Sequence, residues 1–386
     1  MNPDLPILVF DASNISSGGG LTHLINLLQF SNPLIHPFSH IHVWVRRTLH
    51  SRIPDHDWIT VHPSPSSFLP RLIWHTFSLP SFCRQINAQL VFYPGTFNLS
   101  CFQPSTTLSQ NLLPYDLSQI VRYRFSLQTL RLVLLRLIHT ISFRRSTSIY
   151  FLSSYAKARI SPFLPYRFTD SPVIPHGINP VFRSRPRPQR PIEECTIDDP
   201  FKLVYVSIID CYKNHLSVLR ALSLLQQTYG WSIKLALIGP SYAPALNKLL
   251  NHTNYEAVAD IVNYYGELTT QDLASFLVSS DLGIFASSCE NLPITLLEKM
   301  SAGLPTVTSN APPMSDLCSD LPVLFNPYDA TSIADTLYRL IINPKLRVLV
   351  AEEQYRRSFK YTWESATELT FQHFYTTIKK YSHQDN

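Results

Sequence analysis

The second half of the chain alternates short apolar runs with segments of helical periodicity. Five runs rich in β-branched and aromatic residues predict β-strands. They are 201–209, 233–238, 261–265, 282–285 and 304–308. Helices are predicted between them at 214–229, 244–252, 269–279 and 293–302. This alternation predicts a parallel sheet covered by helices on both faces, with ligands beyond the carboxyl ends of its strands.

The first half alternates in the same way but less regularly. Its strand candidates are 7–10, 41–45, 90–93, 106–108, 149–152 and 173–174. Helices are predicted at 21–30 and, as one long apolar segment, at 117–143. Residues 329–381 are predicted to form two or three further helices. We therefore expect an α/β protein of two Rossmann-like domains that face each other across a cleft.

A proline-rich stretch separates the two halves. Prolines at 186, 188, 191 and 200 disfavour regular structure across 183–200, which predicts an interdomain linker. The expected domains are then 1–182 and 201–362. A C-terminal helix over 363–386 is expected to pack back on the first domain.

Composition narrows the class of protein. Hydrophobic residues make up 45% of the 386 residues and charged residues 15%, which excludes a disordered chain. The uncharged apolar runs are shorter than the roughly 18 residues of a membrane-spanning helix. The first residues lack the basic and then apolar order of a signal peptide. Six cysteines without C-x-x-C spacing argue against a zinc ribbon and a disulfide framework. We expect a reduced cytosolic protein.

Charge is divided unequally between the halves. Residues 1–190 contain seventeen Arg, one Lys, six Asp and no Glu, a net charge of +12. The remaining residues contain fourteen basic and twenty-one acidic side chains, a net charge of −7. A basic first half indicates an anionic partner, for which nucleic acid, an anionic membrane and a phosphorylated substrate are candidates.

A glycine triplet follows the first predicted strand. The chain has only ten glycines, and three of them are consecutive at Gly18, Gly19 and Gly20, before a predicted helix. Backbone N–H groups at such a turn can hold a phosphate. The pattern is not the dinucleotide fingerprint G-x-G-x-x-G, and the acidic residue that should follow it is missing. A plain tight turn remains the alternative.

Charged residues of the second half stand near the ends of its predicted strands. Lys213 follows the strand 201–209, Glu290 follows the strand 282–285, and Glu298 lies in the helix 293–302. A lysine and free N–H groups there could bind a diphosphate, and a carboxylate could accept hydrogen bonds from the vicinal hydroxyls of a ribose. The alternatives are a solvated lysine, a capping Glu290 and a surface Glu298.

His176 stands at a strand end, where a structural histidine is the alternative to a base. The sequence lacks a Ser-His-Asp order, H-E-x-x-H and any convincing metal-ligand spacing. Protease, hydrolase and metal-site interpretations are therefore unsupported.

The order of these motifs resembles the retaining, sugar-nucleotide-dependent glycosyltransferases of the GT-B fold, family 4, the glycosyl transferases group 1. Residues 173–179 (VIPHGIN) are similar to its V-I-P-N-G-V-D, 212–215 (YKNH) to its K-N-H, and 290–298 to its E-x7-E. Further similar pieces are 18–20, 237–240, 265–266 and 300–305. The motifs Q-N-x-x-P and Y-K-N-H also resemble a bacterial polysaccharide-synthesis branch.

This resemblance implies an acceptor-side domain over 1–182 and a nucleotide-sugar domain over 201–362. It implies a retaining hexosyltransferase-type enzyme that needs no metal or cofactor, with a nucleotide-diphosphate sugar as donor and a saccharide or lipid-linked acceptor. Lys213 would hold the diphosphate, Glu290 would contact the transferred sugar, and Glu298 would bind the ribose. The other implied donor-side residues are Asn291, Leu292, Pro293, Ile294, Gly239 and Ser207. The implied acceptor or phosphate loop comprises Gly18, Gly19, Gly20, Gln110, Asn111 and His176.

Three positions depart from the family pattern. Ile208 replaces a diphosphate-binding arginine, Pro293 replaces a glycine, and the segment 108–114 lacks the histidine of many members. Gln110 or Asn111 would then take over the sugar contacts. These departures leave open an inactive relative that binds saccharide or nucleotide as an interaction module.

The basic first half matches the expected acceptor. Members of this family often meet the cytosolic leaflet, and six arginines lie on or beside the apolar segment 117–143. They are Arg122, Arg124, Arg131, Arg136, Arg144 and Arg145. We expect a cytoplasmic enzyme of cell-envelope polysaccharide or lipopolysaccharide synthesis, peripheral on the inner face of the plasma membrane. The alternative is a core helix with arginines at its rim. Nucleic-acid binding is disfavoured because the arginines lack interleaved aromatic residues.

Overall fold

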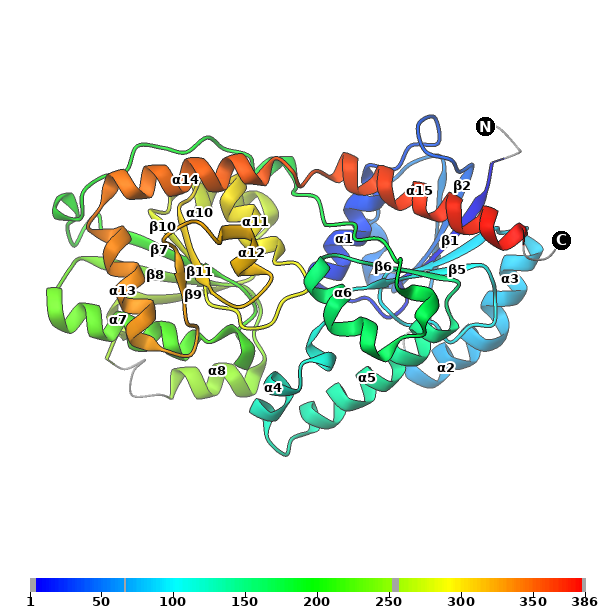
Figure 1. Ribbon diagram of the computed structural model, residues 1–386, viewed down its shortest axis with the longest axis horizontal. Coiled ribbons are helices and arrows are strands. Elements are labelled where there is room, and N and C mark those ends of the chain that lie inside the picture. Colours follow the sequence, from blue (N-terminus) through cyan, green and yellow to red (C-terminus); the bar gives the residue numbers. More distant parts are fainter. Residues whose placement is uncertain (1–4, 66, 252–256, 384–386) are drawn as a thin grey trace. The chain divides into compact units, whose positions relative to one another are not determined.

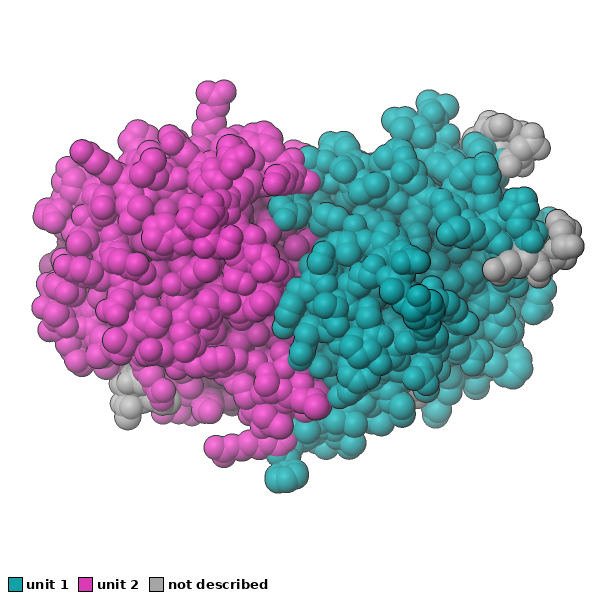
Figure 2. Space-filling view, viewed as in Figure 1, with its two compact units in different colours: residues 1–115, 125–177, 361–386 teal, residues 116–124, 178–360 magenta. Residues whose placement is uncertain are grey.

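The computed structural model describes residues 5–65, 67–251 and 257–383. These residues divide into two compact units, which Figure 2 colours separately. Unit 1 contains the described residues of 1–115, 125–177 and 361–386, and unit 2 contains those of 116–124 and 178–360. The chain therefore passes between the units four times. The predicted boundary at 182/183 compares with an observed passage at 177/178.

Unit 1 is built around a six-stranded parallel sheet with the order β3-β2-β1-β4-β5-β6. Its strands are β1 Ile7–Asp11, β2 His40–Val45, β3 Ile59–Pro63, β4 Leu90–Tyr93, β5 Ser105–Ser109 and β6 Ser148–Phe151. Its helices are α1 Gly18–Gln29, α2 Phe68–Ile73, α3 Leu79–Gln85, α5 Leu127–Arg145, α6 Ser154–Ile160 and α15 Trp363–Ser382. The strand predicted at 173–174 is only an isolated bridge between Phe151 and Val173.

The C-terminal helix α15 completes the core of unit 1. Phe371 and Phe374 of α15 are buried, and their ring centroids lie 6.4 and 5.9 Å from that of Phe10 in β1. Gly177 lies so close to the start of α15 that a Cβ there would be 2.2 Å from the backbone nitrogen of Trp363. Aromatic packing against β1 therefore holds the C-terminal helix in unit 1.

The single helix predicted over 117–143 is wrong. The segment forms α4 Leu117–Ile120, a short 3-10 turn Val121–Tyr123 and then α5. Arg124 adopts a positive φ of 53°, which ends the first helical stretch. Ser126 then caps α5 by accepting a hydrogen bond from the backbone N–H of Thr129. The apolar periodicity did not indicate this break between the two helices.

Unit 2 contains a second six-stranded parallel sheet, with the order β12-β11-β10-β7-β8-β9. Its strands are β7 Phe201–Val206, β8 Ile233–Ile238, β9 Val262–Gly266, β10 Leu282–Phe285, β11 Thr306–Ser309 and β12 Leu324–Phe325. Its longer helices are α7 His215–Tyr229, α8 Ala243–Leu250, α10 Thr270–Ser279, α11 Ile294–Ser301, α12 Met314–Cys318, α13 Ala330–Ile341 and α14 Pro344–Ser358. Helices flank this sheet, with α7 against α13 and α11 against α14 (Figure 1). The five strands predicted from apolar runs are confirmed.

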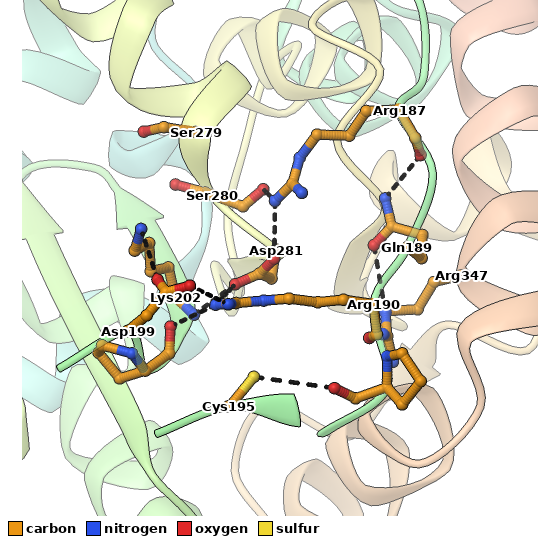
Figure 3. Close-up of polar contacts among 12 residues, drawn as sticks. Arg187, Gln189, Arg190, Cys195, Asp199, Lys202, Ser279, Ser280, Asp281 and Arg347 are labelled. Atoms are coloured by element: carbon orange, nitrogen blue, oxygen red, sulfur yellow. Dashed lines mark hydrogen bonds and ion pairs between the residues drawn. The ribbon is translucent and has the colours of Figure 1, made fainter. Parts of the chain in front are cut away.

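The proline-rich segment 183–200 is part of unit 2. Its only helical turn among the described residues is Ile192–Glu194, as the prolines predict. Figure 3 shows how it is held: Arg187 and Arg190 form ion pairs with the buried Asp281, directly before β10, at 2.7 and 3.3 Å. Asp281 also accepts a 2.8 Å hydrogen bond from the backbone N–H of Lys202. The segment is thus anchored by ion pairs along the second unit.

None of the helices in the described ranges is long and apolar enough to cross a membrane.

Candidate functional site

Two loops at the carboxyl edge of the unit 2 sheet bring Lys213 and Glu290 together. Lys213 ends the 3-10 turn Cys211–Lys213 after β7, and Glu290 lies in the loop after β10. The Lys213 Nζ forms a hydrogen-bonded ion pair with Glu290 Oε1. The side chains are only 8% and 15% exposed. Residues 77 positions apart therefore form one partly buried charge pair.

Glu298 lies on α11, the helix that follows the Glu290 loop. It is 8% exposed, and burial raises the pKa of its carboxyl to about 8. The attraction of Lys299 opposes this shift but does not cancel it. A carboxyl with this pKa is mostly protonated at neutral pH, so it can donate one hydrogen bond and accept others. The alternative of an exposed surface carboxylate is wrong.

Sequence reasoning overlooked Lys299, which is fully buried on α11. Its Nζ donates a 3.3 Å hydrogen bond to the carbonyl of Thr295 and lies 5.2 Å from the centroid of the Phe285 ring. The Lys213 Nζ lies 5.3 Å from the same centroid. Burial lowers the pKa of Lys299 to about 7, against the opposing attraction of Glu298. The one signal in the sequence was a lysine directly beside Glu298 in a helix whose other residues are uncharged.

The remaining donor-side candidates lie on the same sheet edge. Asn291, Leu292 and Pro293 are buried in the loop that leads into α11, and Ile294 is the first residue of that helix. Ser207 and Gly239 follow the neighbouring strands β7 and β8. Gly239 has a φ of 133°, and a Cβ there would lie 2.4 Å from the Ser207 carbonyl oxygen. Only glycine allows these two loops to approach so closely.

In unit 1 the glycine loop faces Gln110. Gly18 has a φ of 69°, and Gly19 and Gly20 form the first turn of α1. A Cβ on Gly19 would lie 3.7 Å from Gln110 Nε2, in ordinary contact. The buried Gln110 Oε1 has no hydrogen-bond partner among the described residues. Asn111 instead accepts a 3.0 Å hydrogen bond from the Leu113 backbone N–H.

His176 is buried within unit 1, with 2% of its surface exposed. Its Nδ1 lies 3.0 Å from Nδ1 of His23 in α1, and His23 Nε2 lies 3.2 Å from the Tyr150 hydroxyl. Burial lowers the pKa of His176 to about 4, so both rings can share one hydrogen bond as neutral groups. This geometry favours a structural histidine behind the glycine loop; contact with an acceptor stays a prediction.

No group of three His, Cys, Asp or Glu in the described part of the chain is placed to hold a metal ion.

Comparisons with known proteins agree with this architecture. Residues 191–357 match the family model described as glycosyl transferases group 1. HepE of Anabaena, solved in complex with UDP, superposes with a TM-score of 0.68 at 14% identity, over 97% of this chain and 100% of that one. WaaG, a glycosyltransferase involved in lipopolysaccharide biosynthesis, superposes with a TM-score of 0.69 at 15% identity, over 94% and 98%. The predicted two-domain α/β fold is confirmed.

Two curated relatives match shorter segments. The sulfoquinovosyl transferase SQD2 of Arabidopsis thaliana is 29% identical over 140 residues, which cover 35% of this chain. The O-antigen chain mannosyltransferase B of Escherichia coli is 22% identical over 109 residues, which cover 28%. The matched segments span 26% and 29% of those proteins' own lengths.

Proposed function

We propose that the protein, whose residues 191–357 match the glycosyl transferases group 1 family, transfers a sugar from a nucleotide-diphosphate donor to a saccharide or lipid-linked acceptor. The relatives named for O-antigen and lipopolysaccharide synthesis support cell-envelope polysaccharide synthesis as the setting. We propose that this synthesis takes place in the cytoplasm. HepE, solved with UDP, supports a nucleotide as the donor's leaving group.

The observation that carries this proposal is the ion pair of Lys213 and Glu290 beside α11. In this pair the carboxylate neutralises the lysine. A diphosphate carries more negative charge than one carboxylate and would draw the ammonium to itself. Glu290 would then be released toward the sugar, whose ring gains positive charge as its bond to the phosphate breaks. One pair of side chains can in this way serve both parts of the donor.

The proposed transfer proceeds with retention and without a metal. The anomeric carbon loses its bond to the phosphate oxygen and gains one to the acceptor oxygen on the same face. The acceptor proton passes to the departing phosphate oxygen. Lys213 stabilises the charge that grows on that phosphate. A covalent sugar ester on Glu290 is the competing route, and trapping one would replace this mechanism.

Glu298 suits the ribose. A buried carboxyl with a pKa of about 8 can accept from one vicinal hydroxyl and donate to, or accept from, the other. Asn291, Leu292, Pro293 and Ile294 would surround the diphosphate from the loop before α11, and Ser207 and Gly239 would line it from the neighbouring strands.

A donor screen tests this function. Purified protein is incubated with a panel of nucleotide sugars and glycan or lipid-linked acceptors, and the release of free nucleoside diphosphate is measured. We expect acceptor-dependent release with one donor. If the folded protein binds a nucleotide but releases none from any donor, the inactive binding module motivated by Ile208 becomes the better account.

The exposed face of α5 supports the proposal of a lipid-linked acceptor at a membrane surface. Five of its apolar residues recur every three or four positions and are between 40% and 87% exposed. They are Leu127, Leu130, Leu134, Leu137 and Ile141. Arg131, Arg144 and Arg145 of the same helix are also exposed, and α5 contains no acidic residue. This combination suits insertion into the surface of an anionic leaflet that holds a lipid-linked acceptor.

Co-sedimentation with vesicles tests the membrane surface. Each basic residue near an anionic surface contributes about 1 kcal/mol, so Arg131→Glu/Arg144→Glu should abolish binding to phosphatidylserine-containing vesicles. Lys345→Glu/Lys360→Glu changes two exposed cations of unit 2 and should bind like wild type. Wild-type protein that stays in the supernatant at low salt would remove the membrane proposal and leave the transfer reaction standing.

A further inference from the structure

A short segment from the first half of the sequence lies on the loops of the second. Residues 116–124, with α4 and the turn Val121–Tyr123, belong to unit 2 although both flanking segments belong to unit 1. The segment leaves unit 1 after Tyr115 and returns to it at Phe125. A nine-residue excursion of this kind needs contacts that hold it, and the side chains of Gln119, Arg122 and Tyr123 provide them.

Arg122 joins the two loops that carry the charged pair. Its guanidinium donates a 2.7 Å hydrogen bond to Asn214 Oδ1 and a 3.2 Å hydrogen bond to Ser288 Oγ. Asn214 directly follows Lys213, and Ser288 stands two residues before Glu290. One planar group therefore spans the loop after β7 and the loop after β10 at the point where their charged residues meet.

The acceptors of Arg122 are themselves fixed to the sheet. Asn214 Nδ2 donates a 2.7 Å hydrogen bond to the carbonyl of Ala286, directly after β10. The backbone N–H of Ser288 donates a 2.9 Å hydrogen bond to the carbonyl of Tyr212. Displacement of Arg122 would thus shift both loops and not only one side chain.

Neighbouring side chains fix the orientation of the Arg122 guanidinium. Gln119 accepts a 3.0 Å hydrogen bond from Arg122 and donates one of 2.8 Å to the Tyr328 hydroxyl. The Arg122 guanidinium carbon lies 5.3 Å from the centroid of the Tyr328 ring. The Tyr123 hydroxyl donates a 2.7 Å hydrogen bond to Asp210, whose carboxylate caps the turn that ends at Lys213. The segment 116–124 thus contacts the loop that carries Lys213 on both sides of this lysine, at Asp210 and at Asn214.

Arg122 forms no ion pair with a carboxylate among the described residues. Its acceptors are an amide oxygen of Gln119, an amide oxygen of Asn214 and a hydroxyl. A surface ion pair is therefore not what holds it in place. The planar fork of donors matches this set, and the single ammonium of a lysine could not reach all three acceptors.

We propose that Arg122 is a positioning residue for the transfer reaction, fixing the separation of the loops that carry Lys213 and Glu290. This inference rests on the proposed function, because it gives those two residues their roles. The proposal adds a residue that touches neither reacting group. Arg122, from the first half of the sequence, must hold the two loops so that Lys213 and Glu290 stay aligned.

Steady-state kinetics of Arg122→Lys and Arg122→Gln test the positioning role of Arg122. A displacement of about 1 Å can cost on the order of a hundredfold in rate, so both variants should lose kcat by roughly ten- to a hundredfold. The dissociation constant for nucleoside diphosphate should rise by less than kcat falls, because Glu298 and α11 stay in place and a displaced Lys213 keeps part of its attraction to the phosphate. Failure of the lysine variant to rescue kcat is the mark of alignment as opposed to charge.

Lys248→Gln is the matched control. Lys248 lines the same 110 Å³ pocket as Arg122 but makes none of the bridging contacts, so its loss removes equal charge without touching the loops. It should retain wild-type kcat. Ser288→Ala should reproduce part of the Arg122 defect, and the double variant with Arg122→Gln should be no worse than Arg122→Gln alone.

The outcomes separate the two proposals. If wild type turns over and Arg122→Lys matches its kcat, the positioning role is overturned and the glycosyltransferase function stands. A loss of kcat that equals the loss of folded protein, measured by active-site titration with nucleotide, would also overturn it. If wild type transfers no sugar at all, the proposed function fails first and this inference falls with it.

Discussion

Glu290 and Lys213 form an ion pair, and this sets what each substitution should do. Removal of Glu290 leaves the ammonium free for a diphosphate but takes away the carboxylate proposed to face the sugar. We expect Glu290→Ala to lower kcat by on the order of a hundredfold or more with little loss of donor affinity. Initial-rate kinetics over a range of donor concentrations check this. Unchanged kcat would contradict the role given to Glu290.

Glu298 should make stability depend on pH. Its pKa is about 8 when folded and near 4.5 when unfolded. Between those values the folded protein holds a proton that the unfolded chain has lost, so the contribution of Glu298 to stability falls as the pH rises from about 5 to 8. Glutamine does not titrate. The melting temperature of Glu298→Gln should therefore rise relative to wild type over this interval, and a difference independent of pH would contradict the buried carboxyl.

The positions of Lys213, Glu290 and Glu298 could be predicted because each stands beside a strand or helix whose apolar pattern is clear. Arg122 and Lys299 could not. Arg122 meets Asn214 across 92 positions and Ser288 across 166, and no local pattern records such contacts. Lys299 sits in an apolar helix as the only buried cation of that turn, and periodicity treats it as a solvent-facing residue.

At the scale of elements, the prolines of 183–200 predict the absence of regular structure but not where the segment lies. Its place depends on Arg187, Arg190 and the buried Asp281 (Figure 3). Similarly, β3 and the helices α2 and α3 were not predicted. β3 is half-buried and its sequence, ITVHP, includes a histidine and a proline, so it lacks the long apolar run that marked the central strands.

Asp281 should be the main anchor of this segment. Asp281 is buried and accepts hydrogen bonds from Arg187, Arg190 and the backbone N–H of Lys202. Hydrogen bonds to charged groups contribute about 1.5–3 kcal/mol, so Asp281→Asn should lower the free energy of unfolding of unit 2 by about 2–3 kcal/mol. Asp199 pairs with Arg190 and Lys202 but is exposed. Asp199→Asn should have a much smaller effect, because solvent screens exposed ion pairs. Equal denaturation midpoints for the two variants would contradict the anchor.

At the scale of the whole molecule, neither unit is one continuous stretch of sequence. The C-terminal helix belongs to the first unit, and a piece of the first half belongs to the second. Apolar periodicity predicts that such helices exist, and the charge difference between the halves predicts different partners. Which helix covers which sheet depends on long-range packing, such as that of Phe374 on Phe10, and remains invisible to local patterns.

Because the C-terminal helix α15 belongs to unit 1, substitution of its buried residues should destabilise unit 1. Phe374 is 1% exposed, and Phe374→Ala should cost about 3–5 kcal/mol. Hydrogen exchange should become faster in β1 and β4 and stay unchanged in β8 and β9. Leu369→Ala removes a partly exposed side chain of the same helix and should have a small effect. Faster exchange confined to unit 2 would contradict the assignment of α15.

The central claim is that Lys213, Glu290 and Glu298 share one site for a nucleoside diphosphate. Calorimetric titration of UDP, GDP and ADP into wild type, Lys213→Ala, Glu298→Ala and the control Lys248→Ala tests it most directly. We expect one nucleotide to bind wild type and the control equally, and to bind the other two variants at least about tenfold more weakly, because Lys213→Ala removes a charged hydrogen bond to the phosphate and Glu298→Ala removes the hydrogen bonds to the ribose. Binding of equal strength to all four proteins would contradict the account.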